Sequence, residues 1–181
     1  MLAAARDLLQ DSGLAGLSMR ALARRLDVAP NTLYSHVASK TALVDDVLDA
    51  VLAEVAAPDP RAADPLAAIA AVMTSTFEVL LEHPDLVSLY LARQGAAGPV
   101  ATALGDGLVD LLGRGGVHGA PAREALRVLI VFTIGFAAFA SQTRVPGSLR
   151  RRPDVDLRET FERGLAWLLQ GILATAVSRR R

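Results

Sequence analysis

The sequence predicts an all-α protein in two parts: a small N-terminal unit of short helices and a larger C-terminal helical domain. Apolar residues recur at helical spacing through most of the 181 residues, and no segment shows the alternation typical of a half-buried strand. Ala, Leu and Arg, which favour helices, fill most segments. The stretch 57–65, APDPRAADP, contains three prolines and interrupts the helical pattern, so we interpret it as a linker.

Two short helices are expected at the N-terminus. The first covers residues 2–10, and Gly13 is suited to end it as a C-terminal cap. Ser18 is a good N-cap for a second helix, MRALARRL, whose apolar residues fall on one face. Asp27 follows directly, and because aspartate tolerates the left-handed conformation better than most residues, a tight turn is expected there.

A third helix begins at Pro30, where proline loses no needed N–H group, and is expected to end near Val37. Ser39 can cap a fourth, longer helix over residues 40–56, which connects the two domains. We therefore expect a first domain at 1–48 and a second at 57–181. Helices of the second domain are expected at 66–81, 84–93, 100–112, 122–144 and 157–177.

Composition narrows the class of protein. The chain is 52% hydrophobic, so a large core or a partner must bury much apolar surface. Because 19 basic residues balance 19 acidic ones, any contact with nucleic acid must be a local patch. The absence of cysteine excludes disulfides and thiolate metal sites. We expect no membrane span, since the uncharged stretch 128–143 is shorter than the ~20 residues that a spanning helix needs. The start, MLAAARDLLQ, does not resemble a signal peptide, so a cytoplasmic location is expected.

The third helix, within VAPNTLYSHVASK, is unusual because its outer face consists almost entirely of hydrogen-bonding side chains. Only Leu33 and Val37, four residues apart, are apolar enough to face a core. Three short helices with a tight turn between the second and third form a helix-turn-helix, whose last helix enters the DNA major groove. Asn31 and Thr32 are placed to reach base edges, and Tyr34 suits phosphate oxygens.

The segment GLAGLSMRALARRLDVAPNTLYSHVASKTALVDDV resembles the DNA-binding domain of the tetracycline-repressor (TetR) family of transcription regulators. The sequence departs from the usual family pattern at the turn, where Asp27 replaces glycine, and before the third helix, where Ala29 replaces a Ser or Thr cap. The resemblance implies a DNA-facing set made of Ser18, Arg20, Pro30, Asn31, Thr32, Tyr34, Ser35, His36 and Lys40.

Two later segments, VFTIGFAAF and FERGLAWLLQGI, resemble parts of the C-terminal domain of the same tetracycline-repressor class. The resemblance implies that the two helices pair across a two-fold axis into a four-helix bundle. Their small residues permit close helix approach, and their leucines supply apolar surface. A homodimer on a palindromic operator, with recognition helices about 34–36 Å apart, is therefore expected. The expected interface comprises Gly135, Ala138, Gly164, Leu165, Leu168, Gly171 and Ile172.

A regulator of this build is expected to respond to a small molecule held between the helices of its second domain. Thr133 and Gln142 are favoured as lining residues because a buried polar side chain needs a partner. The aromatic and methionine candidates could equally be ordinary core. The full set of candidates is Met73, Phe77, Tyr90, Phe132, Thr133, Phe136, Gln142 and Trp167.

No metal or other cofactor is expected, and no catalytic motif is found. Phe139 occupies the position at which the family's metal–tetracycline binders carry an acidic group, and no two histidines are paired at a metal-ligand spacing. Nucleophile-elbow, phosphate-loop and zinc-protease motifs are missing from the sequence. Asp45, Asp46 and Asp49 are interpreted as surface acids of the fourth helix. The sequence thus predicts a DNA-binding repressor released by a ligand. An activator, and a helical small-molecule-binding or interaction protein that does not bind DNA, stay open as alternatives.

Overall fold

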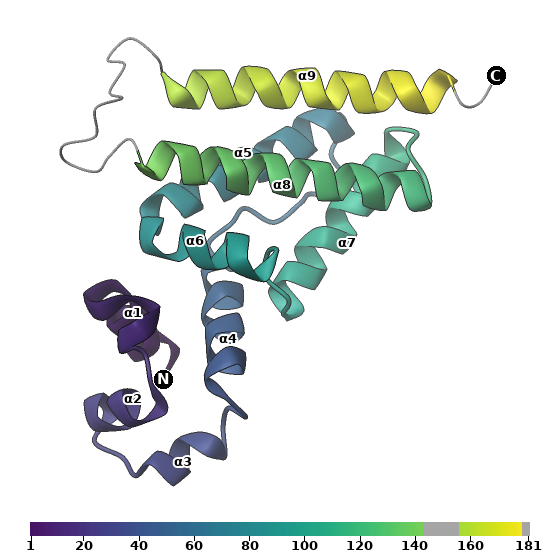
Figure 1. Ribbon diagram of the computed structural model, residues 1–181. Coiled ribbons are helices and arrows are strands. Elements are labelled where there is room, and N and C mark those ends of the chain that lie inside the picture. The colour runs from purple at the N-terminus through teal and green to yellow at the C-terminus, as the bar shows by residue number, and fades with distance from the viewer. Residues whose placement is uncertain (143–155, 179–181) are drawn as a thin grey trace.

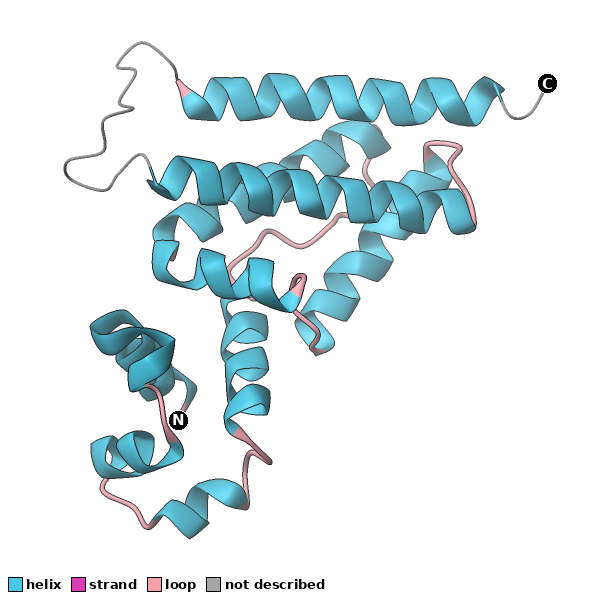
Figure 2. Cartoon of the chain, in the orientation of Figure 1, coloured by secondary structure: helices cyan, strands magenta, loops and turns pink. Residues whose placement is uncertain are grey.

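The computed structural model describes residues 1–142 and 156–178, and within these ranges it consists of helices joined by loops, without strands (Figures 1 and 2). The predicted all-α class is confirmed for this part of the chain. The helices are α1 Leu2–Gly16, α2 Met19–Leu26, α3 Pro30–Tyr34, α4 Lys40–Leu52, α5 Pro65–Glu82, α6 Pro84–Arg93, α7 Pro99–Arg114, α8 Ala120–Gln142 and α9 Leu157–Ser178.

Helices α1 and α2 begin near their predicted first residues, and the predicted cap and turn residues of α2 are confirmed. Gly13 has φ +64° and kinks α1, but the helix continues for another turn to Gly16 instead of ending there. The Ser18 hydroxyl accepts a hydrogen bond from the Ala21 N–H at 3.1 Å and caps α2. Asp27 adopts the left-handed conformation at φ 53°, which confirms the predicted turn without a glycine.

Helices α3 and α4 are both shorter than predicted. Helix α3 ends at Tyr34 instead of near Val37, and the Ser35 hydroxyl donates to the Thr32 carbonyl at 2.7 Å in the closing turn. Helix α4 starts at the predicted Ser39 cap but ends at Leu52 instead of residue 56. After it the backbone tightens into successive i to i−3 hydrogen bonds, which is a common way for a helix to finish.

The second domain contains five helices within the described residues, each within a few residues of its predicted bounds. Helices α5, α6 and α7 each begin with a proline, which is favoured at the first helical position. Helices α8 and α9 run side by side, and α4 joins the N-terminal helices to this domain (Figure 1). Four phenylalanines from α5, α8 and α9 pack together, with Phe77 stacked on Phe161 at a centroid distance of 4.2 Å.

Among the described helices, α5 and α8 are long and apolar enough to cross a membrane by length and composition alone. This is weak evidence for a membrane span, because the core helices of soluble proteins meet the same criterion. Helix α5 packs against α7, α8 and α9, and α8 also contacts α6 and α7. Both helices therefore pack in the middle of the second domain, in contact with several of its other helices.

Candidate functional site

Helix α3 presents its polar side chains to solvent, as the sequence predicts for a recognition helix. Leu33 and Val37 are buried beneath it and anchor it to the other N-terminal helices. Tyr34 is 54% exposed. The remaining predicted DNA-facing residues of this segment are also exposed: Pro30, Asn31, Thr32, Ser35 and His36. The segment is therefore not packed inside its own subunit, and its hydrogen-bonding groups line one accessible surface.

Three of the predicted DNA-facing residues also have structural partners within the chain. Ser18 caps α2, and Ser35 bonds the Thr32 carbonyl. The Lys40 ammonium group donates to the Leu14 carbonyl at 2.6 Å, so it satisfies a carbonyl at the end of α1. An ammonium group has three donors, and a role at phosphate stays a prediction for Lys40.

A pair of interactions that the sequence analysis missed holds α2 against α1. The Arg25 guanidinium contacts the carboxylates of Asp11 at 3.0 Å and Asp7 at 3.4 Å. All three side chains are substantially exposed, so these ion pairs orient the helix more than they stabilise it. Arg20, on the same helix, is exposed as predicted.

Helix α4 is attached to the second domain by Asp49, which was predicted to be a surface acid. That prediction is wrong, because Asp49 is only 6% exposed. Its carboxylate accepts hydrogen bonds from the backbone N–H groups of Val100 at 3.1 Å and Ala101 at 2.8 Å. These are free donors in the first turn of α7, whose own N-cap, Gly98, has no side chain. An aspartate from α4 thus caps a helix about fifty residues further along the chain.

Two further contacts connect α4 with α6. The Tyr90 hydroxyl donates to the Leu48 carbonyl at 2.5 Å, and burial, with smaller contributions from the charges of Asp49 and Glu54, raises the pKa of Tyr90 well above its ordinary value. Asp45, the second of the predicted surface acids, pairs with the Arg93 guanidinium through two hydrogen bonds, one of them 2.7 Å long. Helix α4 is therefore fixed to the start of α7 and to the end of α6.

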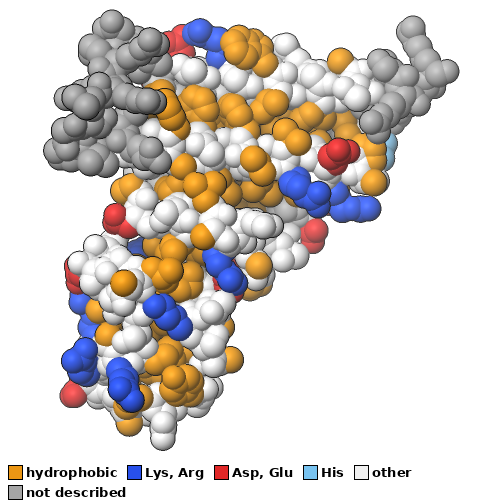
Figure 3. All heavy atoms as spheres, viewed as in Figure 1, with side chains coloured by type: hydrophobic (Ala, Val, Ile, Leu, Met, Phe, Trp, Pro, Cys, Tyr) orange, Lys and Arg blue, Asp and Glu red, His pale blue; other side chains and the backbone are white. Residues whose placement is uncertain are grey.

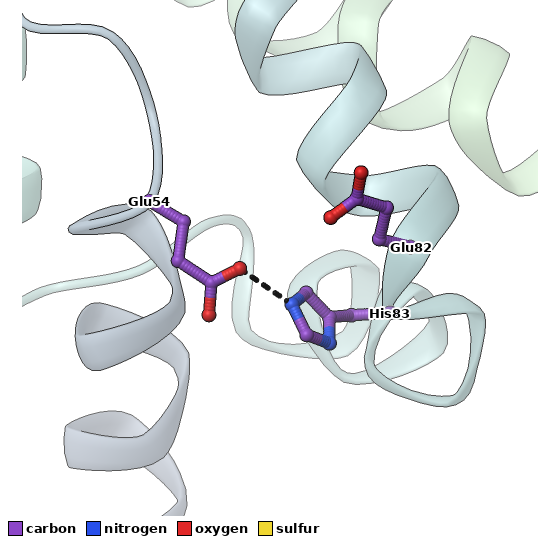
Figure 4. Close-up of side chains that lie close together, drawn as sticks. All are labelled: Glu54, Glu82 and His83. Atoms are coloured by element: carbon purple, nitrogen blue, oxygen red, sulfur yellow. Dashed lines mark hydrogen bonds and ion pairs between the residues drawn. The ribbon is translucent and has the colours of Figure 1, made fainter.

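A cluster of polar side chains lies just beyond the end of α4. Figure 4 shows the Glu54 carboxylate facing the His83 ring, with an Oε2–Nε2 distance of 2.9 Å. This hydrogen bond to His83 is the main reason that the pKa of Glu54 is lowered from its ordinary value. Glu82 brings a third possible metal ligand, and the three ligand atoms lie within 4.8 Å of one another. The sequence analysis missed this group because Glu54 is distant in the sequence from Glu82 and His83.

A cavity of about 130 Å³, here called the central cavity, lies between α4, α5, α6, α7 and α8. Three of the predicted lining residues border it: Met73, Tyr90 and Thr133. Apolar side chains make most of the wall, for example Leu52 from α4 and Leu104 from α7. No Lys, Arg, His, Asp or Glu is found among the described residues that line it. The central cavity therefore touches the same helices that hold α4.

The other candidates for the ligand site lie elsewhere. Phe77 borders neither the central cavity nor the groove described next, and its ring packs in the aromatic cluster, so its role at a ligand stays a prediction. Phe132, Phe136 and Trp167 border an open groove of about 940 Å³ between α8 and α9 instead of the central cavity. The groove is larger but more open to solvent, whereas the central cavity is the more enclosed of the two. The side chain of Gln142 lies outside the described residues.

The groove contains several residues that were predicted to form a dimer interface. Gly164, Leu168, Gly171 and Ile172 line it. Leu165 is a correction, since it is 1% exposed and packs in the core of its own subunit. Gly135 faces open space, and Ala138 is partly buried against the core.

Large apolar side chains remain uncovered beside the groove: Val131 at 65%, Phe139 at 60% and Trp167 at 66% exposure. Hydrophobic side chains also gather along α8 and α9 in Figure 3. The sequence analysis did not assign Val131 or Phe139 to the interface.

Comparison with known proteins agrees with this architecture. Residues 1–47 match the model of the bacterial regulatory proteins, tetR family. An HTH-type transcriptional regulator from Saccharopolyspora erythraea is 31% identical over 199 residues, spanning 97% of this chain and 84% of that protein. The TetR family protein ActR from Streptomyces coelicolor, solved in complex with (S)-DNPA, superposes with a TM-score of 0.80 at 27% identity, covering 97% of this chain and 96% of that one. For BioQ from Mycobacterium smegmatis the TM-score is 0.79 at 31% identity, covering 96% and 95% of the two chains. With its exposed recognition helix, the chain therefore belongs to the tetR family of bacterial regulatory proteins, and is a DNA-binding transcription regulator and not an enzyme.

Proposed function

We propose that this regulator is a cytoplasmic repressor that binds a palindromic operator as a homodimer and leaves it when a small molecule occupies the central cavity. The observation that carries the DNA-binding half is the exposure of α3. The side chains of Asn31, Thr32 and Tyr34 are exposed to solvent, whereas Leu33 and Val37 are buried. In a helix-turn-helix, this exposed part of the last helix faces base edges and phosphates. The remaining polar groups of the set surround them.

The homodimer is supported by the apolar surface of α8 and α9. A monomer rarely leaves several large apolar side chains together in water, and Val131, Phe139 and Trp167 are each at least 60% exposed. At Gly135 and Gly171 an added Cβ would meet nothing within 4 Å of its own chain, so a partner helix has room to approach closely. Under two-fold symmetry, the apolar surface of a second copy would cover the exposed apolar side chains of the first, and the reverse.

Release by a ligand follows from what surrounds the central cavity. Leu52 and Tyr90 line it, and Tyr90 also bonds the α4 backbone, so a molecule inside it contacts elements that position the DNA-binding unit. A ligand that binds better to a geometry unsuited to DNA shifts the population toward that geometry. A hundredfold loss of operator affinity requires about 2.7 kcal/mol of differential binding.

DNA binding is tested with a double substitution, Asn31→Ala and Tyr34→Ala, on the exposed face of α3. Both side chains are exposed, so we expect the variant to keep the thermal stability of the native protein and to lose operator binding. The measurement is fluorescence anisotropy with duplexes from the intergenic DNA beside the coding region. Leu91→Ala, which truncates an exposed apolar residue of α6, is the control and should bind normally. Retention of affinity by the double variant would show that another surface contacts DNA.

The dimer is tested separately by placing a charge on the proposed interface. Phe139→Asp should convert the protein to a monomer in light-scattering measurements, because an unpaired carboxylate is costly in an apolar interface. Ser88→Asp, at an exposed position of α6, introduces the same charge away from this surface and should leave the dimer intact. A native protein that is already monomeric at micromolar concentration would rule the interface out.

A further inference from the structure

Thr133 is the one described side chain of the central cavity whose oxygen is both fully buried and unpaired. Its exposure is 0%, and its Oγ1 atom has no hydrogen-bond partner among the described residues. A buried hydroxyl left without a partner is unfavourable, because it has lost its hydrogen bonds to water and gained none in return. Thr133 is also one of the residues that line the central cavity, so we infer that a molecule in that cavity can supply the missing bond.

The other hydroxyl groups of this wall are already engaged. Thr76 donates to the Val72 carbonyl at 2.8 Å, and Tyr90 donates to the Leu48 carbonyl at 2.5 Å. A ligand that competed for either group would have to replace an existing bond. A polar group of a ligand can therefore form a new hydrogen bond with Thr133 without breaking an existing one.

The wall also restricts the charge of a ligand. The lining side chains that the structure describes are apolar or neutral, without a carboxylate, imidazole, ammonium or guanidinium group. Moving an ion into such surroundings without a counter-charge costs several kcal/mol. Anionic and cationic ligands are therefore disfavoured, whereas a neutral molecule with one polar group matches both the apolar wall and the unpaired hydroxyl.

The volume sets the size of the ligand. The central cavity measures about 130 Å³. An apolar protein cavity of about 150 Å³ accommodates benzene. A molecule of about one six-membered ring therefore fills the space without displacing a helix, and pockets for drug-sized ligands are at least twice as large.

From these observations we propose that the central cavity binds an uncharged molecule of about one ring carrying a single hydroxyl or carbonyl group, and that Thr133 recognises this oxygen. The inference rests on the proposed function only in taking the central cavity as the effector site. Thr133 is then a specificity residue: it selects among molecules of similar size by whether they present an oxygen.

The test uses three probes of similar ring size: phenol, toluene and benzoate. Phenol and toluene have the same number of heavy atoms, and only phenol carries the oxygen. Dissociation constants are measured by calorimetry on the full-length native protein and on Thr133→Val, which replaces the hydroxyl with a methyl group of similar size. We expect the native protein to bind phenol about tenfold more tightly than toluene, and not to bind benzoate. In Thr133→Val this preference should disappear.

Thr76→Val is the matched control, because it removes a hydroxyl from the same wall that is already bonded within the chain. It should keep the preference for phenol. Thr133→Val removes an unpaired buried group, so its melting temperature without probe should equal or exceed that of the native protein, which checks that it folds. Equal affinities of the native protein for phenol and toluene, binding of benzoate, or failure of all three probes to bind would each overturn the proposal.

Operator binding is measured in parallel, with and without phenol. If phenol binds through Thr133 but leaves the protein on its operator, the recognition site stands and the proposed release mechanism fails. If the protein binds its operator but no probe enters the central cavity, the proposal about Thr133 fails and DNA binding is unaffected.

Discussion

Replacing Asp49 with alanine should destabilise the protein by about 3 kcal/mol, an unusually large effect for a residue that the sequence pattern places among surface acids. The side chain is 6% exposed and its carboxylate accepts two backbone N–H groups at the start of α7. Its removal leaves both donors without their acceptor, at about 1–3 kcal/mol for each buried group. Loss of an N-cap alone typically costs about 1 kcal/mol.

The geometry of Gly98 supplies a sharper version of this prediction. Gly98 is the N-cap of α7, with φ −130° and ψ −177°, a conformation that serine adopts readily at this position. A Cβ on it would lie 2.2 Å from the Asp49 carboxyl carbon, so any side chain there collides with the cap from α4. Gly98→Ser should therefore destabilise the native protein. In the Asp49→Ala background the same change should restore about 1 kcal/mol, since serine can cap the helix itself.

Urea denaturation of the four proteins, at one protein concentration, measures the effect. For a chain of this size a loss of 3 kcal/mol lowers the melting temperature by roughly 6–12 °C, so thermal unfolding gives a second measurement. The expected signature is a change of sign: Gly98→Ser is harmful with Asp49 present and beneficial without it. Equal destabilisation in both backgrounds would refute the proposed collision, and a neutral Asp49→Ala would refute the cap.

Two further predictions concern the ends and faces of other helices. The pKa of Glu54 is lowered by His83, so its contribution to stability is present above about pH 4.5 and lost as pH falls through the lowered pKa. Glu54→Gln should therefore make the free energy of unfolding, measured with urea, less sensitive to acid. The effect is at most about 1 kcal/mol because the Glu54 carboxylate is substantially exposed. Gly164→Ala should destabilise the subunit, since the added Cβ would lie 2.9 Å from the Phe132 ring. At Gly171 an added Cβ meets nothing within 4 Å of its own chain. Gly171→Ala should therefore stabilise the helix by up to about 1 kcal/mol but weaken the dimer. Denaturation and light scattering distinguish these two outcomes, and a Gly171→Ala dimer of native affinity would contradict close packing at that glycine.

The sequence predicted best those features that depend on neighbouring residues. Ser18, Asp27 and Pro30 each act within one turn of their own helix, so their types and spacing were sufficient to locate the helix-turn-helix. The exposure of Tyr34 followed from the same local pattern, because only Leu33 and Val37 are apolar in that helix. Local signals of this kind do not require knowledge of the rest of the fold.

Features that depend on distant contacts were missed or misplaced. Asp49 finds its partners 51 and 52 residues away, and nothing in its own helix distinguishes it from a solvated acid. In α9, periodicity shows apolar residues on more than one face but not which face meets the same subunit. Leu165 was therefore assigned to the interface although it is buried in the core of its own subunit. Trp167 was assigned to the ligand site, and because it lines the open groove its role there stays a prediction.

The contacts of α4 suggest which interactions transmit ligand binding to the DNA unit. The exposed pair between Asp45 and Arg93 is worth at most about 1 kcal/mol and is weakened by salt. The buried bonds of Asp49 and Tyr90 are worth about 1–3 kcal/mol each. Only the buried bonds reach the ~2.7 kcal/mol needed for a hundredfold change in operator affinity. A ligand that displaces the start of α7 or the end of α6 must strain one of them, so the coupling should persist at high salt, where a mechanism based on exposed ion pairs would fail.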